Sequence, residues 1–284
     1  MKYIGFGVFQ NCNRLPNVSI TEGVVRIGGS AFIRCTALTD IKIPSSVTSI
    51  GEKAFDNTGW YNNQPDGILY LDKWLVGYKG SKPTGEVSIE DGTKGIASQA
   101  FYNCSGMTNV SVPSSVRRID DWTFEGCTGL TSINIAEGVK SIGIGAFQYC
   151  SGLDSVTIPS SVTSIDSQAF YYCSGLNRVT SLILEPFEID EYIFSYRYNA
   201  ATLYVPKGTK QKYEETAGWN KFKTIKEIGD IDQPKGDVNG DQAVDVADIA
   251  SIISCMAGSE AVDKAAADVN GDGTVDVADI ATII

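Results

Sequence analysis

Oxygen-bearing side chains recur with the same spacing in two twelve-residue segments near the C-terminus, Asp237–Asp248 and Asp268–Asp279. In each segment Asp fills the first, fifth, ninth and twelfth positions, and Asn fills the third. Calcium is a hard cation that takes roughly six to eight oxygen ligands, and an EF-hand loop supplies them from these positions together with the backbone carbonyl of the seventh. The sequence therefore predicts two Ca²⁺ ions in duplicated EF-hand-like loops.

Each loop has six predicted ligands, and its last Asp stands in place of the usual bidentate Glu. Val244 and Val275, at the eighth positions, are expected to pair the loops back to back. The sixth position is Gln242 in one loop and Gly273 in the other, so the first site is expected to be weaker or distorted. The predicted ligands are Asp237, Asn239, Asp241, Ala243 (carbonyl), Asp245 and Asp248 in the first loop, and Asp268, Asn270, Asp272, Thr274 (carbonyl), Asp276 and Asp279 in the second.

Two other interpretations of these loops fit less well. Magnesium prefers near-ideal octahedra and keeps its water. A solvated acidic loop at the start of a helix needs no metal, because Asp is favourable at a helix N-terminus. That interpretation leaves the twofold match of ligand spacing unexplained.

An apolar run follows each loop and predicts the start of an amphipathic helix, at 249–256 and 280–284. No full helix precedes either loop, so residues 236–284 differ from a complete EF-hand and resemble the dockerin type I module of secreted bacterial proteins. The resemblance implies a small all-α calcium-binding domain that binds a cohesin-like partner through its helices. Loop positions ten and eleven, which are Val-Ala in both copies (246–247 and 277–278), would contribute to recognition. We hypothesise that the near-identity of the halves lets either helix face dock.

The elements before these loops are marked by an aromatic residue every 23 residues. An alternating apolar pair such as Val156/Ile158 follows five of these aromatic residues and indicates a short strand with one buried face. One such unit cannot bury its own apolar face, so neighbouring units must stack. This predicts an α/β repeat solenoid of 23-residue coils, with a parallel sheet on one face and a short helical or irregular return. The aromatic residues are Phe9, Phe32, Phe55, Tyr78, Phe101, Phe124, Phe147 and Phe170.

The repeat pattern fails between Asp56 and Tyr78. Residues 68–78 indicate two short strands joined near Asp72-Lys73, a hairpin that replaces one coil while preserving its length.

The unit Ile-x-Ile-Pro-x-x-Val-x-x-Ile-Gly-x-x-Ala-Phe-x-x-Cys resembles the BspA-like leucine-rich repeat family of bacterial surface proteins, roughly from Gly5 to Ile228. The resemblance implies a leucine-rich-repeat-like solenoid with adhesion-type roles, and the segment of about 180–228 looks like the closing cap of such arrays. We therefore expect a solenoid over 1–228, a linker over 229–235 and a dockerin-like module over 236–284.

Six of the seven cysteines occupy one repeat position. One interpretation is an interior ladder of free, buried thiols. The other is a set of disulfides between neighbouring coils, such as Cys127 with Cys150, because stacked coils could bring their Cα atoms close enough. A zinc site fits less well, since stacked coils place the sulfurs in a row and zinc prefers a tetrahedron.

Composition excludes several classes of function. The formal net charge of −11 argues against nucleic-acid binding, and the absence of histidine removes Ser/His/Asp and Cys/His catalytic arrangements. No stretch approaches the ~20 apolar residues of a membrane-spanning helix. The first residues follow the repeat register and do not read as a signal peptide, so an export signal is expected outside this sequence.

We therefore predict a non-enzymatic, secreted or cell-surface adhesion protein. Its solenoid would bind an unknown protein or glycan ligand, and its calcium-loaded module would dock to a cohesin-like partner. The alternatives are an accessory carbohydrate-binding or architectural component of a surface glycan-degrading assembly. A glycosidase needs only two carboxylates, but the carboxylates outside the calcium loops are scattered. The aromatic residues considered for sugar stacking are Trp60, Tyr61, Trp74, Tyr149, Tyr171 and Tyr172.

Overall fold

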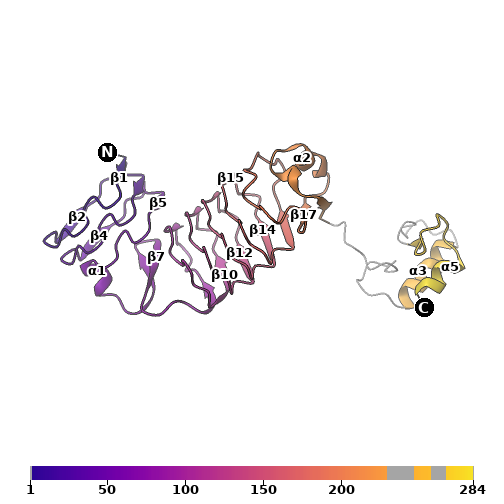
Figure 1. Ribbon diagram of the computed structural model, residues 1–284, viewed down its shortest axis with the longest axis horizontal. Coiled ribbons are helices and arrows are strands. Elements are labelled where there is room, and N and C mark those ends of the chain that lie inside the picture. The colour runs from indigo at the N-terminus through magenta and orange to yellow at the C-terminus, as the bar shows by residue number, and fades with distance from the viewer. Residues whose placement is uncertain (1, 229–245, 257–266, 284) are drawn as a thin grey trace. The chain divides into compact units, whose positions relative to one another are not determined.

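The computed structural model describes residues 2–228, 246–256 and 267–283, and divides the chain into two units, Met1–Ile228 and Gly229–Ile284. The first unit is a stack of coils that follow one another in chain order (Figure 1). Most coils contribute one strand to a row of longer strands and one to a row of two-residue strands. The 23-residue solenoid predicted from the sequence is confirmed.

The longer strands pair in parallel within three sheets, ordered β2-β4, β12-β10-β8 and β14-β16-β17-β18. Their register follows the repeat, because Val110 faces Ile133 and Val156 faces Val179. Each strand alternates buried apolar and outward polar residues, which is why the apolar pairs were visible in the sequence. The bounds are β2 (Asn17–Ser19), β4 (Asp40–Lys42), β8 (Gly85–Ser88), β10 (Met107–Val112), β12 (Ser132–Ile135), β14 (Ser155–Ile158), β16 (Arg178–Ser181), β17 (Thr202–Val205) and β18 (Thr224–Glu227).

The return segment of each coil was expected to be helical or irregular, and it contains a second short strand. These strands form the sheet β1-β3-β5 and, with β6 (Gly67–Leu71) and β7 (Trp74–Lys79), the sheet β15-β13-β11-β9-β7-β6. Apart from β6, which pairs antiparallel with β7, the solenoid therefore has a second parallel row. Two residues are too few to show an alternating pattern, and only the stacking of coils turns them into a sheet. The bounds are β1 (Tyr3–Ile4), β3 (Arg26–Ile27), β5 (Ser49–Ile50), β9 (Gly95–Ile96), β11 (Arg118–Ile119), β13 (Ser141–Ile142) and β15 (Ser164–Ile165).

The turn around each repeated aromatic residue is held by backbone hydrogen bonds to the next coil. The N–H of Phe124 donates to the carbonyl of Ala146, and that of Phe147 donates to Ala169, both at 2.8 Å. The residues two before and two after the aromatic often adopt a left-handed backbone, as at Trp122 (φ 54°) and Tyr149 (φ 60°). The polar groups of this turn are therefore satisfied between coils.

The repeated phenylalanines form two columns inside the stack. Phe9, Phe32 and Phe55 stack with ring centroids 5.1 and 5.7 Å apart. A second column continues with centroid separations of 5.0–5.4 Å and extends beyond the predicted series. Its members are Phe101, Phe124, Phe147, Phe170 and Phe194.

The predicted hairpin separates the two columns and is confirmed. Strand β6 (Gly67–Leu71) pairs antiparallel with β7 (Trp74–Lys79), and β7 in turn pairs in parallel with β9. Leu71 and Trp74 pack in the core of the first coils, whereas Leu75 packs in the core of the later ones. The short helix α1 (Gly59–Asn62) precedes the hairpin, and the Thr58 hydroxyl caps it by accepting the N–H of Tyr61 at 3.1 Å.

All seven cysteines are free, and five of the six at the repeat position are buried, which confirms the ladder and not the disulfides. The exception is Cys12 of the first coil, which is exposed. The thiols of Cys127, Cys150 and Cys173 donate to the carbonyl of the phenylalanine 26 residues earlier, at 3.1–3.2 Å. Each thiol is thus satisfied by the backbone of the preceding coil and does not need a second sulfur.

The end of the second column is covered by residues 202–228, the C-terminal part of the cap predicted over about 180–228. This part adds α2 (Lys210–Glu215) and the 3-10 turn η1 (Trp219–Lys221) (Figure 1). Phe194 contacts Trp219 and Phe222 at centroid distances of 5.9 and 5.3 Å. The buried Tyr213 hydroxyl donates to the carbonyl of Ile183 at 2.7 Å. A terminal coil would otherwise expose its core and its strand edge.

The described part of the second unit contains α3 (Val246–Met256) and α5 (Val277–Ile283). Ile252 and Cys255 of α3 pack against Ala267 and Val269 at the start of the second loop. That the unit as a whole is all-α stays a prediction. No helix of the described residues is long and apolar enough to span a bilayer.

Candidate calcium centre and solenoid surfaces

The second loop folds around the carboxylate of its first residue. Oδ1 of Asp268 accepts the N–H groups of Gly271 at 2.8 Å and Asp272 at 3.0 Å. Oδ2 of Asp268 accepts the N–H of Gly273 at 2.9 Å. These bonds bend the chain at two left-handed glycines, Gly271 (φ 79°) and Gly273 (φ 88°), so the sixth position of this loop uses the backbone freedom of glycine.

The last residue of the loop reaches back to its middle. Asp279 accepts the N–H of Asn270 on Oδ1 at 3.0 Å and the N–H of Asp276 on Oδ2 at 2.8 Å. The predicted ligands at positions one and twelve therefore both accept hydrogen bonds from the loop backbone and hold the loop in its folded form.

The middle carboxylate of the loop is held by its neighbour. The hydroxyl and N–H of Thr274 donate to Oδ1 of Asp272 at 2.7 and 2.9 Å. These bonds lower the pKa of the Asp272 carboxyl, so the residue stays ionised to a lower pH than an ordinary aspartate.

Burial distinguishes the twelfth position from the others. Asp279 is 0% exposed in the first turn of α5, and its equivalent Asp248 is 0% exposed in the first turn of α3. No Lys or Arg in the described part of the chain forms an ion pair with Asp279. Two backbone N–H groups satisfy this buried carboxylate in part, and a bound cation would balance its charge, so the donor chemistry of this loop fits Ca²⁺.

Among the described residues, no three Asp, Glu or Cys side chains converge as a group that could hold a metal ion. The reason is visible in the second loop, where the carboxylates of Asp268, Asp272 and Asp279 accept N–H groups of their own loop. Of the first loop only residues 246–248 are described, so the predicted ligands Asp237, Asn239, Asp241, Ala243 and Asp245 are not placed. Gln242 and Val244 of the first loop are not placed either. Val275, the expected partner of Val244, packs on the core of the unit.

Comparison with known proteins identifies both parts of the chain. The BspA type leucine-rich repeat region matches residues 1–63 and 78–201 in six copies. The chain belongs to the BspA type leucine-rich repeat family. The dockerin type I domain matches residues 235–284. The gap between the matched repeats covers most of the hairpin, where a regular coil is missing.

Three solved structures are similar to this BspA-type protein. The pneumococcal vaccine antigen PcpA shares 16% identity with a TM-score of 0.52, over 80% of this chain and 66% of its own. A leucine-rich cell surface protein from Faecalibacterium prausnitzii A2-165 shares 21% (TM-score 0.41, 80% and 63% covered), and the T. pallidum leucine-rich repeat protein shares 18% (TM-score 0.38, 86% and 84% covered). The chain thus spans less than two thirds of the first two proteins, and the likeness to PcpA supports the fold alone. No curated protein sequence matches the chain.

The two families define a coarse role for this BspA-type protein. Both kinds of domain are non-catalytic protein-interaction modules that are typical of secreted or surface proteins, and type I dockerin domains bind calcium. The chain therefore has a surface or extracellular role in protein interaction.

The aromatic residues considered for sugar stacking lie in different settings. The expectation for Trp74 was wrong, because it is 3% exposed and joins the core through the hairpin. Tyr149, Tyr171 and Tyr172 do cluster on the surface, together with Tyr196, which the repeat did not flag because it follows a one-residue insertion. The Tyr172 and Tyr196 rings lie 4.5 Å apart, so they cover one face of each other.

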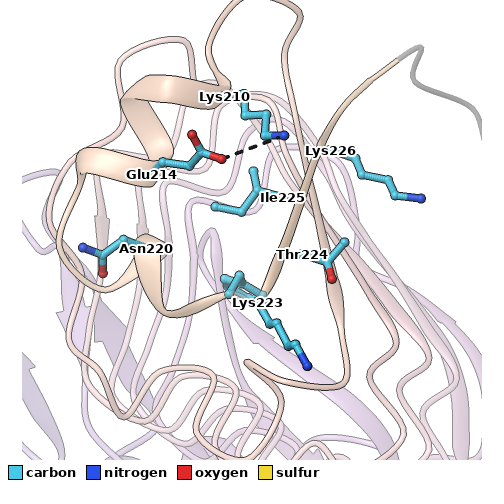
Figure 2. A pocket seen from close by; sticks show the side chains of 8 residues that line it. Lys210, Glu214, Asn220, Lys223, Thr224, Ile225 and Lys226 are labelled. Carbon is cyan, nitrogen blue, oxygen red and sulfur yellow. Dashed lines mark ion pairs between the residues drawn. The ribbon is translucent and has the colours of Figure 1, made fainter.

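One cavity of about 430 Å³ lies in the cap, between α2 and β18 (Figure 2). Lys210, Lys223 and Lys226 contribute to its lining. Lys210 forms an ion pair with Glu214 at 3.9 Å (Figure 2). Its apolar floor includes Ile225.

A larger groove of about 630 Å³ follows the short-strand row beside Trp74. Lys94, Arg117 and Arg118 line it, and Lys140 occupies the same coil position as Lys94 and Arg117 in the next coil. Arg118 is held by three carboxylates, those of Asp120, Asp121 and Asp166, at 2.7–3.3 Å.

Proposed function

We propose that this protein docks, through a dockerin domain loaded with two Ca²⁺ ions, to a cohesin-like partner, and that its solenoid presents a ligand-binding surface at the cell exterior. The protein acts by adhesion and carries out no catalysis. The observation that carries the proposed docking is the first turn of α5. Val277 is 70% exposed there, and Asp279, two residues later, is buried.

In this proposal each loop binds one Ca²⁺ ion. In the second loop Asp268, Asn270, Asp272, the Thr274 carbonyl, Asp276 and Asp279 would hold it, and the first loop repeats the same residue types. A bound Ca²⁺ would neutralise the cluster of carboxylates and fix the start of the following helix. Only the ionised carboxylate is a ligand, and aspartates are ionised at neutral pH.

The docking half rests on the apolar side chains that this unit exposes. Val277 is followed by exposed Ala278, and α3 exposes Ile253 (53%) and Met256 (43%). Apolar residues exposed next to an ordered helix start are typical of a protein interface. Calcium ordering of the helix start would therefore make docking depend on the ion.

The first experiment titrates the full chain with Ca²⁺ in a calorimeter. We expect two ions per chain and, in Asp279→Asn, one ion fewer, because a terminal ligand of the second loop is lost. Asp154→Asn, an exposed carboxylate of the solenoid, is the control and keeps both ions. No heat in the unmodified chain contradicts the calcium assignment.

The second experiment measures binding to a panel of immobilised cohesin domains with Ca²⁺ or with a chelator. We expect binding by at least one cohesin, loss on chelation, and weakening by at least about tenfold in Val277→Asp because a charge enters the apolar contact. Ile144→Asp, on an equally apolar but solenoid position (38% exposed), is the control. Binding that survives chelation, or that depends on Ile144, would contradict the proposal.

A further inference from the structure

We propose that a pocket beside the β6–β7 hairpin binds a neutral sugar residue of a glycan. This inference rests on the proposed role of the solenoid as the ligand-presenting part of the protein, and it names the class of ligand and its place. The pocket has a volume of about 400 Å³, and its walls include Asp56, Tyr61, Tyr78, Gln99, Tyr102 and Asn103.

The pocket exists because the hairpin interrupts the phenylalanine column. Between Phe55 and Phe101 the repeat places Tyr78, which lies on β7 and stacks on neither ring. The residues of a regular coil would fill this part of the stack, whereas the hairpin leaves Tyr78 half-buried at a pocket wall. An irregularity in an otherwise regular array is where a concave site can form.

Three tyrosines from three separate segments meet at this pocket. Tyr61 comes from α1, Tyr78 from β7, and Tyr102 from the turn of the following coil, where it is 41% exposed. Aromatic rings offer an apolar face with a polar hydroxyl at the edge, which matches the C–H faces and hydroxyls of a sugar. The ammonium of Lys79 lies 5.8 Å from the centre of the Tyr61 ring, and covers one face of it.

Three polar side chains of the pocket, those of Asp56, Gln99 and Asn103, have unused hydrogen-bonding capacity. Within the described residues, the carboxylate of Asp56 accepts no hydrogen bond and forms no ion pair, and burial raises its pKa against the opposing effect of Lys53. Within the same described residues, the side-chain amides of Gln99 and Asn103 also make no hydrogen bond. Sugar hydroxyls both donate and accept, so they can satisfy a carboxylate and two amides together.

The charges of the pocket favour a neutral ligand over an ion. Lys53 and Lys82 line it beside Asp56, and Lys82 is fixed by donating to the carbonyl of Asn103 at 2.8 Å. A cationic ligand would be repelled by the two lysines, although tyrosines and a carboxylate otherwise suit a cation. An anionic ligand would meet the unpartnered Asp56. A hydroxyl-rich neutral group avoids both costs.

The test uses the full chain with Ca²⁺ and a panel of neutral oligosaccharides, namely cellohexaose, xylohexaose and mannohexaose, with choline and tri-galacturonate as charged probes. Saturation-transfer NMR with irradiation of the aromatic protons reports contact with tyrosines, and calorimetry gives the affinity. We expect at least one neutral oligosaccharide to bind, and Asp56→Asn and Tyr102→Ala each to weaken it by about tenfold or more. Binding should also weaken as the pH falls through the raised pKa of Asp56, and Asp56→Asn should remove that dependence.

The matched control is Tyr172→Ala, which removes an equally exposed tyrosine (39%) from the surface cluster outside the pocket. Binding lost in Tyr172→Ala but kept in Tyr102→Ala would overturn the proposal, as would binding of only choline or tri-galacturonate, or of no member of the panel. Thermal unfolding of each variant shows that it remains folded. Calcium and cohesin binding are read separately, so their failure would count against the proposed docking and not against the pocket.

Discussion

The carboxylate of Asp120 accepts a hydrogen bond from the backbone N–H of Ile50 at 3.2 Å, across 70 residues of sequence. Ile50 lies in β5, the last strand of the first short sheet, and its carbonyl accepts the N–H of Ser98 at 2.9 Å. Asp120 also accepts the hydroxyl of Ser49 at 3.1 Å and the Nε–H of Arg118 at 2.7 Å. A buried side chain thus ties the first coils to the later ones at the place where the hairpin breaks the regular stack.

The substitution Asp120→Ala is expected to destabilise the solenoid by about 2–4 kcal/mol. It leaves the buried N–H of Ile50 without this acceptor and removes one of the three carboxylates that hold half-buried Arg118. Urea unfolding followed by circular dichroism measures the effect. Asp166→Ala removes a partner of the same Arg118 at an exposed position (38%) and should cost less than about 1 kcal/mol. Equal effects of the two substitutions would show that the contact with Ile50 is unimportant.

The substitution Phe147→Ala is expected to cost about 3–5 kcal/mol, since it opens a cavity in the middle of the second column. Phe147 is 0% exposed and stacks on Phe124 and Phe170 at 5.2 and 5.0 Å. Ile144→Ala, three residues away and 38% exposed, should change the free energy of unfolding by less than about 1 kcal/mol. Denaturant titration of both variants distinguishes a packed column from a loosely filled interior.

Thiol labelling of the native protein at neutral pH is expected to modify Cys12 and to spare the other six cysteines. Cys12 is exposed, whereas burial raises the pKa of Cys127 and of Cys173 to about 12. The reactive form is the thiolate, so these thiols stay protonated until the pH approaches that value. Mass spectrometry after alkylation should find one label on the folded chain and seven on the unfolded chain. Rapid native labelling of Cys127 or Cys150 would contradict the ladder.

The substitution Gly273→Gln gives the second calcium loop the residue found in the first. Gly273 has φ 88°, where a side chain costs about 1–2 kcal/mol, so we expect calcium affinity at this loop to fall roughly tenfold. Calorimetry measures this affinity. Gly106→Ala, outside the unit, is unsuitable as a control because the added Cβ would clash with Thr84. Gly208→Ala, with a positive φ of 79° and open space in the cap, carries the same backbone strain without touching the loop. Unchanged affinity in Gly273→Gln would show that the first loop is not handicapped by Gln242.

The features predicted correctly from the sequence are those with a periodic or local signal. A 23-residue recurrence of Phe and Cys can be satisfied only if the coils stack in register, because each apolar face needs a neighbour. The hairpin was visible because Ile68–Tyr78 broke that recurrence with two strand-like runs. The spacing of Asp268 to Asp279 predicted a calcium loop, and the structure shows the carboxylates of both residues accepting N–H groups of that loop, while the bound ion stays a prediction.

The features that were missed depend on contacts between segments. The second row of strands uses two residues per coil, such as Ile119 facing Ile142, and these have no alternating pattern of their own. Trp74 was expected on the surface, but the hairpin turns it into the core of the first coils. Asp56, Tyr78 and Tyr102 gave no signal as a pocket, since each comes from a different segment.

The sequence by itself determined the coil length and the interior columns, because burial acts on residues at a constant spacing. The calcium ligands of the two loops stay a prediction from the sequence. Only the tertiary structure decided how the coils on either side of the hairpin meet, and therefore which side chains remain exposed there. The contact of Asp120 with Ile50 and the pocket around Asp56 both arise from that junction. The repeat does not predict them, because the 23-residue pattern fails at the hairpin, where a regular coil is missing.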